Sequence, residues 1–293
     1  MILTRRRFIA ISAACLSARP LDAATWRGRA LGADAQISLR GDRQAGKAAL
    51  REAQLALRAI EAAFSIYDPA SELSRLNAAG TLSPSPRFSA LLDRVDPIWR
   101  ATGAAFDPSI QPLWHALATG ADISEARARV GWDRVRHTAA SVRLDRGQQL
   151  SFNGIAQGAA TDEIVSILRA HGFEKALVNI GEYAGLGGPW RLGLTDPQFG
   201  QVAQVTLRDG AVATSSPGAM KVGRGFHIVD PRHGPVRPKW STVTVEAEDA
   251  TTADGLSTAL CLMTFDQARK LRRSHPGVRR IVLVDWDGNL RTV

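Results

Sequence analysis

The segment from Ser151 to Asp162, SFNGIAQGAATD, has residue types and spacing that could bring the backbone close to a phosphate group. Its pattern predicts an apolar strand, a turn containing Gly154, and a helix that carries an inward-facing acid, Asp162. Glycine permits close approach, and the first turn of a helix offers unpaired N–H groups and a positive dipole end. The alternative is a turn that serves only the fold, since Gly-rich turns are common.

A second candidate site is the pair Asp254 and Thr258 in TADGLSTAL. Residues four apart lie on one face of a helix, so a carboxylate and a hydroxyl would lie next to each other there. Both are hard oxygen donors, which suit a Mg²⁺ ion that keeps other positions for water and phosphate. Such pairs also occur on solvated helices. The apolar neighbours predict a buried helix, where an unpaired Asp is costly, and this favours a ligand.

Three further segments could contribute to a site. His227 lies between apolar residues before a turn in FHIVDPRHG, where a lone His is more often a hydrogen-bonding residue than a base. The segment 64–77 joins an aromatic, Tyr67, to a Ser-Glu capping turn. It could form a wall for a planar ring or simply hold two helices at an angle. The segment 102–114 contains Phe106 and Asp107 before Pro108 and has the same ambiguity.

The start of the chain predicts export by the twin-arginine route. Arg5-Arg6-Arg7 precedes a short apolar run and small residues at Ala23-Ala24, so we expect a signal peptide over 1–24 and a periplasmic mature domain over 25–293. The run is too short to span a bilayer, which needs about 20 residues. A lipid anchor on Cys15 is a minor alternative. Cys261, the other cysteine, is expected in the core, and no intramolecular disulfide would survive signal cleavage.

Composition indicates an ordinary globular protein of 293 residues with a net charge of +9. Because the positive charge is scattered Arg rather than tracts interleaved with aromatics, nucleic acid is a poor candidate partner. A basic surface is better suited to anionic cofactors, or to association with a membrane surface.

The elements that must position these residues alternate irregularly between helices and strands. Apolar periodicity predicts helices over 44–64, near 71–77, over 88–99, from the Gly154 turn to about 170, and over 252–264 and 266–274. Strands are expected around 30–39 and over 149–152, 176–180, 190–194, 203–207, 211–214, 242–247 and 281–286. This order predicts an α+β or α/β/α fold with mixed sheets, forming one extended unit with a helical insertion at about 85–140.

In their order and spacing, these segments resemble the ApbE family of flavin transferases. The resemblance rests on 64–77, 102–113, 153–162, 177–187, 213–216, 227–234 and 243–258, and it covers nearly the whole mature chain. It implies an ApbE-like (T-fold-like) α+β domain and a reaction: Mg²⁺-dependent transfer of FMN from FAD to a Thr hydroxyl of an acceptor flavoprotein, with release of AMP. FAD and that acceptor, which bears a Thr in a periplasmic segment, would be its partners.

The resemblance also implies roles for individual residues. Tyr67 and Phe106 would wall the flavin, Glu72 and Asn77 would shape the site, and Asp162 and Thr214 would contact the nucleotide. Asp254, Thr258 and a main-chain carbonyl near Gly154 would hold the metal, and His227 would be the general base or an orienting group. The full set expected to bind FAD is Tyr67, Glu72, Asn77, Phe106, Asp107, Gly154, Ile155, Ala156, Gln157, Asp162, Thr214 and Ser215.

Two departures from the family pattern leave other functions open. Gln157 replaces a usual Lys, which removes a cation near the anionic ligand, although Gln still donates hydrogen bonds. The turn 179–183 carries Glu182 where a Gly-Gly-Asp type of turn is usual. A metal-dependent FAD pyrophosphatase would need the same site with water in place of Thr. A flavin carrier or assembly factor for a periplasmic respiratory reductase would need binding alone.

Overall fold

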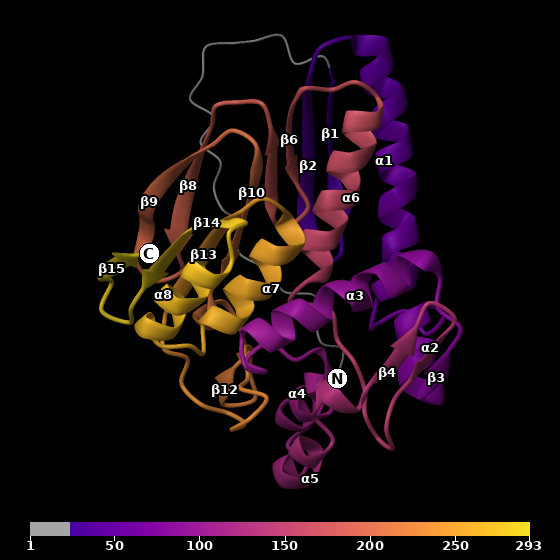
Figure 1. Ribbon diagram of the computed structural model, residues 1–293, viewed down its shortest axis with the longest axis vertical. Coiled ribbons are helices and arrows are strands. Elements are labelled where there is room, and N and C mark those ends of the chain that lie inside the picture. Colours follow the sequence, from indigo (N-terminus) through magenta and orange to yellow (C-terminus); the bar gives the residue numbers. More distant parts are fainter. Residues whose placement is uncertain (1–23) are drawn as a thin grey trace.

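An eight-stranded antiparallel sheet forms the centre of the molecule in the computed structural model, which describes residues 24–293 (Figure 1). The strand order is β1-β2-β6-β7-β10-β13-β14-β15. The strands are β1 (Ala24–Ala30), β2 (Ala33–Arg40), β6 (Lys175–Asn179), β7 (Tyr183–Leu186), β10 (Gly210–Ser215), β13 (Thr242–Ala247), β14 (Val278–Val284) and β15 (Leu290–Thr292). The predicted signal peptide lies outside the described residues except for Ala24.

Helices cover one face of this sheet (Figure 1). They are α1 (Arg43–Phe64), α6 (Ala156–Ala170), α7 (Ala250–Leu260) and α8 (Phe265–Ser274). A helical region follows α1 in the chain, with α2 (Glu72–Ala79), α3 (Pro86–Ala101), α4 (Gln111–Thr119) and α5 (Ile123–Ala128). None of the helices in residues 24–293 is both long and apolar enough to cross a membrane.

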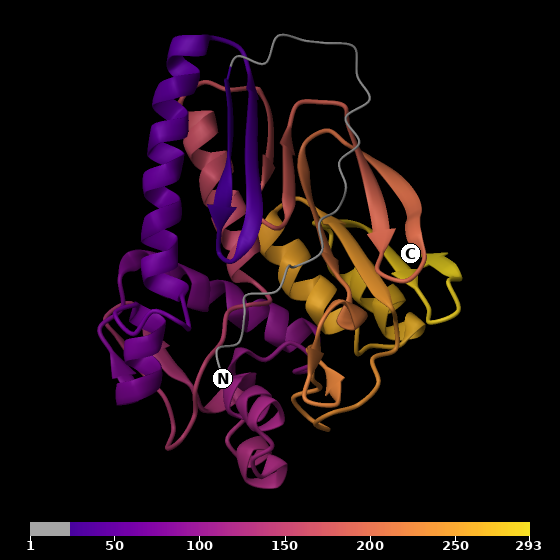
Figure 2. The same cartoon turned by 180° about the vertical axis from the view of Figure 1, so that it is seen from behind.

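The other face of the sheet is covered by a hairpin of β8 (Trp190–Asp196) and β9 (Gly200–Leu207), which Figure 2 shows beside the C-terminal strands. A second apolar cluster joins this hairpin to the sheet and includes Trp190, Leu192 and Val212. Asp196 ties the two layers, because its Oδ2 accepts from the hydroxyls of Ser241 and Thr242, each at 2.6 Å. The middle strands of the sheet are therefore packed on both faces, whereas most residues of the edge strand β1 are not buried.

Two small sheets complete the fold. The first joins β3 (Thr81–Leu82), β5 (Ser141–Arg143) and β4 (Arg136–Thr138), and the second joins β11 (Lys221–Val222) to β12 (Gly225–Phe226). Short 3₁₀ helices occupy Pro108–Ile110, Trp132–Arg134 and Pro217–Ala219. The predicted α+β fold is confirmed, and α3, α4 and α5 lie in the region expected to be a helical insertion.

The long helix α1 forms where the sequence predicts it because its apolar residues recur at helical spacing. Ala53, Leu57, Ile60 and Phe64 are all buried. Asp42 caps the N-terminus by accepting from the N–H of Ala45 at 2.7 Å. The predicted cap of the next helix is also confirmed, since the Ser71 hydroxyl accepts from the N–H of Ser74.

The predicted strand over 149–152 is wrong. Leu150 and Phe152 are buried like residues of a strand, but no strand pairs with them. Instead the Asn77 side chain takes the place of a neighbouring strand: its Oδ1 accepts from the Leu150 N–H at 2.7 Å and its Nδ2 donates to the Leu150 carbonyl at 2.8 Å. The Ser151 N–H donates to the Pro108 carbonyl. Backbone groups are thus satisfied without a sheet.

The predicted first strand, around 30–39, corresponds to β2, but it is preceded by the unpredicted strand β1, with which it forms a hairpin. The chain reverses at Leu31 and Gly32, which have φ of 49° and 81°. Two consecutive residues with positive φ form the tight turn that matches the strand twist, but Leu-Gly lacks the usual Asn-Gly or Asp-Gly signal. The sequence pattern therefore missed the reversal.

Candidate active site

Helices α6 and α7 approach each other very closely at Gly158. A Cβ on Gly158 would lie 2.3 Å from the Ala250 carbonyl oxygen and 2.8 Å from the Asp254 Cβ. The absence of a side chain lets the Gly158 N–H donate to the Asp254 Oδ2 at 2.9 Å. The glycine spacing of the predicted turn therefore brings two helices together and fixes the Asp254 carboxylate between them.

We expect Gly158→Ala to lower the free energy of unfolding by about 1–3 kcal/mol, because the added methyl overpacks the helix contact. This loss should exceed the roughly 1 kcal/mol that alanine gains in helix propensity. Urea denaturation measures the difference. Ser166→Ala, at an exposed position of the same helix, is the control and should change stability by less than about 0.5 kcal/mol. Equal stability of Gly158→Ala and the parent chain would contradict the close approach.

The turn before α6 meets the far end of α7. A Cβ on Gly154 would lie 2.9 Å from Thr258 Oγ1 and 3.4 Å from a ring carbon of Phe106. Asp254 and Thr258 lie one turn apart on α7, as predicted. Three segments that are distant in sequence therefore meet at Gly154: the turn before α6, the helix α7 and the loop that contains Phe106. The structure thus brings the three predicted metal-holding residues and one predicted flavin wall together.

A hydroxyl group from β10, that of Ser215, lines the same place. Ser215 Oγ lies 2.7 Å from Ser257 Oγ and 3.4 Å from Thr258 Oγ1. Neighbouring Thr214 bonds through its hydroxyl to Thr244, and its N–H donates to the Glu182 carboxylate at 3.0 Å. Ser215 therefore contacts α7 directly, whereas the Thr214 side chain lies on the opposite face of β10 and contacts β13.

Two buried carboxylates dominate the electrostatics. Asp254 is 3% exposed and Glu182 is 6% exposed. Burial raises the pKa of both, and the Asp254 charge raises the pKa of Glu182 further. The only opposing contributions are the N–H of Gly158 on Asp254 and the N–H of Thr214 on Glu182. Among residues 24–293, no side-chain cation forms an ion pair with either acid, and a divalent cation would stabilise such a buried pair.

The donor set fits Mg²⁺. Asp254 and Thr258 supply hard oxygens, and the Gly154 carbonyl belongs to the turn beside Thr258. No group of three or more His, Cys, Asp or Glu side chains in residues 24–293 is arranged to hold a metal. A Mg²⁺ ion would instead be held by one carboxylate, one hydroxyl and one main-chain carbonyl. This small number of protein ligands suits an ion whose remaining coordination positions are filled by water and phosphate.

Gln157 presents a buried donor without a partner. Its side chain lies against Gly181, where a Cβ would be 2.4 Å from Gln157 Nε2, and Gly181 has a φ of +95°. Gln157 is 7% exposed, and its Nε2 has no hydrogen-bond partner within the described residues. Because buried polar groups are normally paired, this N–H group favours a ligand rich in acceptors, such as a phosphate.

His227 is held in the tautomer that a general base needs. Its Nδ1 lies 3.1 Å from the Pro217 carbonyl oxygen and 3.3 Å from that of Met220. Carbonyls only accept, so Nδ1–H donates to them and Nε2 keeps its lone pair. Burial lowers the pKa of His227 below 6.5, against the smaller effect of these hydrogen bonds. The ring is therefore neutral at pH 7.

Three predicted binding residues use their polar atoms to hold the fold. Asn77 pairs with Leu150, as described, and Glu72 accepts from the N–H of Ser85 at 2.7 Å. Asp107 accepts from Ser109 and from the Trp99 and Trp132 N–H groups. Asp107 thus fixes the loop that follows Phe106, Asn77 fixes the segment before Gly154, and Glu72 fixes the turn before α3.

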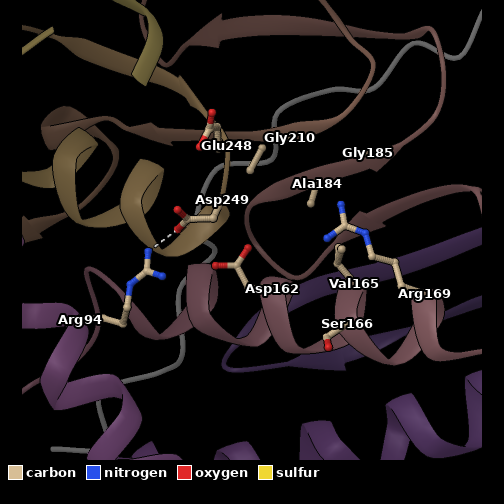
Figure 3. Close-up of a pocket in the computed structure, with 11 residues that line it drawn as sticks. Arg94, Asp162, Val165, Ser166, Arg169, Ala184, Gly185, Gly210, Glu248 and Asp249 are labelled. Carbon is tan, nitrogen blue, oxygen red and sulfur yellow. Dashed lines mark hydrogen bonds and ion pairs between the residues drawn. The ribbon is translucent and has the colours of Figure 1, made fainter. Parts of the chain in front are cut away.

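Asp162 belongs to α6 and contacts the first residues of α7, at the end of that helix opposite to Thr258. Its carboxylate accepts from the N–H groups of Ala250 and Thr251 at 2.7 and 2.9 Å. It also lines a pocket of about 190 Å³ (Figure 3). Arg94 and Asp249, which form an ion pair at 2.6 Å, lie on the same pocket. No other predicted site residue lines this pocket, and the role of Asp162 at the nucleotide stays a prediction.

The remaining predicted residues surround the turn or lie further out. Ile155 and Ala156 are buried at the start of α6. Tyr67 is 71% exposed just beyond α1, where its ring is accessible to a ligand. Sequence reasoning missed Ser257 and treated Glu182 only as a departure from a pattern. Ser257 directly precedes Thr258, which was predicted to hold the metal, but its contact with Ser215 depends on the fold and could not be predicted from the sequence.

Comparisons with known proteins agree with this geometry. A model described as the ApbE family matches residues 31–282. The FAD:protein FMN transferase of Treponema pallidum is 29% identical over 274 residues, which cover 79% of this chain and 75% of that protein. A Klebsiella pneumoniae protein of the same name is 27% identical over 295 residues, covering 89% and 84%.

Solved structures agree as well. The ApbE protein of Thermotoga maritima superposes with a TM-score of 0.82 at 25% identity and covers 92% of this chain and 96% of its own. The apo form of the flavinyl transferase ApbE of Pseudomonas stutzeri gives 0.79 at 26% identity, covering 92% and 93%. The family match spans most of the chain, so the resemblance indicated by its motifs is confirmed: this chain belongs to the ApbE family.

Proposed function

We propose that this protein transfers FMN from FAD to a Thr hydroxyl of an acceptor flavoprotein, in a Mg²⁺-dependent reaction that releases AMP. The main support is the buried Asp254, one helical turn from Thr258, which contacts the Gly154 turn. The unpaired Gln157 N–H, three residues after Gly154, adds a donor suited to a phosphate. The relatives named FAD:protein FMN transferase support the reaction class.

The bond changes in this reaction are simple. The acceptor oxygen forms a bond to the FMN-side phosphorus, and the bond from that phosphorus to the bridging oxygen breaks. AMP leaves with the bonding electron pair on that oxygen. His227 Nε2, which keeps a lone pair because Nδ1–H faces carbonyls, accepts the hydroxyl proton.

The residues of the site would supply binding and orientation. Asp254, Thr258 and the Gly154 carbonyl would hold Mg²⁺, which when bound neutralises charge that develops on phosphate oxygens. The Gln157 amide would donate to the anionic substrate, and Phe106, with Tyr67, would contact the flavin ring. Ser215 Oγ, which lies 2.7 Å from Ser257 Oγ and 3.4 Å from Thr258 Oγ1, would help to orient the Thr258 hydroxyl.

The test incubates the chain with FAD, Mg²⁺ and a flavin-free acceptor protein that carries a reactive Thr. We expect mass spectrometry to find a covalent FMN adduct on the acceptor and an equal amount of AMP. Free FMN and AMP with an unmodified acceptor would show a pyrophosphatase instead. Intact FAD under all conditions, with measurable FAD binding, would show a carrier or assembly factor.

We also propose that the protein works in the periplasm after twin-arginine export. Replacing Arg5, Arg6 and Arg7 with lysine should leave uncleaved precursor in the cytoplasm, because this route reads paired arginines. Cell fractionation and the mass of the retained chain measure the effect. The control replaces Arg27 and Arg29 of β1 with lysine and should not alter export. Equal periplasmic amounts of the signal variant and the parent chain would refute the route.

A further inference from the structure

One surface next to His227 carries positive charge that the proposed reaction does not use. It is a ladder of four stacked side chains, Lys221, Phe226, Trp286 and Arg237, which we call the basic ladder. Lys221 Nζ lies 3.9 Å from the Phe226 ring centre, the Phe226 and Trp286 rings are 5.1 Å apart, and Arg237 Cζ lies 4.9 Å from the Trp286 ring centre. Cation–π contacts of this kind hold a charged group in place without neutralising it.

The charges of the ladder are free for a partner. Lys221 and Arg237 are exposed, and neither forms an ion pair with any described residue. The nearby acid Asp285 accepts from the side chain and N–H of Asn289 and from the N–H of Asp287, and not from the ladder. The ladder therefore presents two fixed cations to solvent.

The surrounding segment reinforces this charge. Residues 217–240 contain five cations and a single acid. That acid, Asp230, is paired with Arg232 at 2.9 Å and His233 at 3.2 Å, so it does not offset the ladder. Arg224 and Lys239 are also exposed without an ion pair among the described residues.

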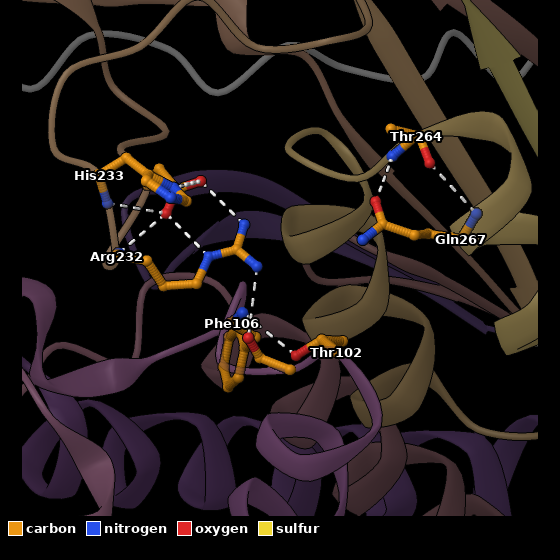
Figure 4. Close-up of polar contacts among 8 residues, drawn as sticks. Thr102, Phe106, Arg232, His233, Thr264 and Gln267 are labelled. Atoms are coloured by element: carbon orange, nitrogen blue, oxygen red, sulfur yellow. Dashed lines mark hydrogen bonds and ion pairs between the residues drawn. The ribbon is translucent and has the colours of Figure 1, made fainter.

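The basic ladder is built into the walls of the site. Lys221 and Phe226 are cross-strand partners in the β11–β12 hairpin, and His227 directly follows Phe226. The same segment reaches the flavin side, because Arg232 Nη1 donates to the Gly103 carbonyl near Phe106 (Figure 4). A chain that brings a hydroxyl to His227 would therefore pass close to the ladder.

We propose that the basic ladder binds an acidic segment of the acceptor protein, next to the Thr that receives FMN. This inference rests on the proposed function for the identity of the partner. Fixed, unneutralised cations beside a reacting centre favour Asp and Glu side chains, and they speed encounter with an acidic partner by about 10- to 10³-fold at low salt.

The test uses fluorescent peptides as probes, because binding can be measured without transfer. Two short peptides share a central Thr, and one has Asp and Glu on both sides where the other has Asn and Gln. We expect the full chain to bind the acidic peptide at least about tenfold more tightly by fluorescence anisotropy, and salt to remove the difference.

The decisive variant is Lys221→Glu with Arg237→Glu, which should abolish discrimination between the peptides. Its matched control, Arg51→Glu with Arg58→Glu, makes the same change in net charge on exposed positions of α1 and should retain it. Thermal unfolding and FAD affinity verify that both variants fold. If charge reversal prevents folding, Lys221→Gln with Arg237→Gln replaces it, with a partial loss expected.

Three results would overturn the proposal. They are equal affinity for the two peptides, equal loss in the ladder and control variants, or binding to phosphatidylglycerol vesicles without peptide discrimination, which would make the surface a membrane contact. Failure of FMN transfer would not affect this readout. A chain that discriminates the peptides but transfers no FMN would refute the proposed function and not the acidic-ligand surface.

Discussion

Replacing Asp254 with asparagine is expected to lower Mg²⁺-dependent FMN transfer by about 10³-fold or more, because a metal at a developing phosphate charge contributes several kcal/mol to the transition state. Asparagine keeps an oxygen that can accept from the Gly158 N–H, which lies 2.9 Å from the carboxylate, so the contact between α6 and α7 should persist. Single-turnover transfer at several Mg²⁺ concentrations measures the loss.

The stability of the metal-free chain separates loss of metal from loss of fold. Burial raises the pKa of Asp254, so the ionised carboxylate destabilises the folded state without a cation. Asparagine lacks this penalty, and the metal-free variant should be at least as stable as the parent chain. Mg²⁺ should raise the unfolding temperature of the parent and not that of the variant.

Asp266→Asn, which changes an exposed carboxylate on α8, serves as the control and should leave transfer and the Mg²⁺ effect unchanged. Full turnover by the Asp254 variant at limiting Mg²⁺ would show that this residue does not hold the metal. A large drop in its metal-free stability would show a structural role instead.

Periodic segments were the most predictable part of the fold. Helix α1 was expected over 44–64 and spans Arg43–Phe64, because one apolar stripe fixes both its length and its buried face. The strand over 242–247 matches β13. The prediction of a strand over 149–152 was wrong because burial alone does not identify a strand. The Phe152 ring centre lies 5.7 Å from that of Phe64 and 5.6 Å from that of Phe88, while the Asn77 side chain satisfies the Leu150 backbone.

The site was predictable in its parts and not in its contacts. Spacing placed Asp254 and Thr258 on one helical face, and glycines marked the close approach at Gly158. Spacing could not show that Glu182, from another strand region, adds its charge to that of Asp254. Such contacts depend on the order of strands in the sheet, which no local pattern encodes.

Because long-range contacts cannot be predicted from local patterns, the sequence also did not reveal the roles of two carboxylates or the existence of the basic ladder. Asp107 and Asp162 have the residue type of ligands, but donors from other segments occupy their oxygens. Trp286 joins Phe226 and Arg237 only because the β14–β15 turn folds beside the β11–β12 hairpin. Long-range packing decides whether a polar side chain faces a ligand or the protein.

His227→Ala is expected to lower transfer by about 10²- to 10⁴-fold at saturating FAD, which is the usual contribution of a general base. His227→Asn is the sharper variant, because its amide N–H can still donate to the Pro217 and Met220 carbonyls while no basic nitrogen remains. Both variants should lose activity to a similar extent and bind FAD normally. Recovery of transfer in His227→Asn would show that His227 only positions the loop.

The pH dependence gives an independent test of the same role. Burial lowers the pKa of His227 below 6.5, so the ring is neutral and able to accept a proton above that lowered value. Single-turnover transfer by the parent chain should therefore rise with pH through a pKa below 6.5 and then level off. This rise should vanish in His227→Asn and persist in the control His115→Ala, an exposed position on α4. A parent profile that is unchanged by His227→Asn would mean that another group takes the proton.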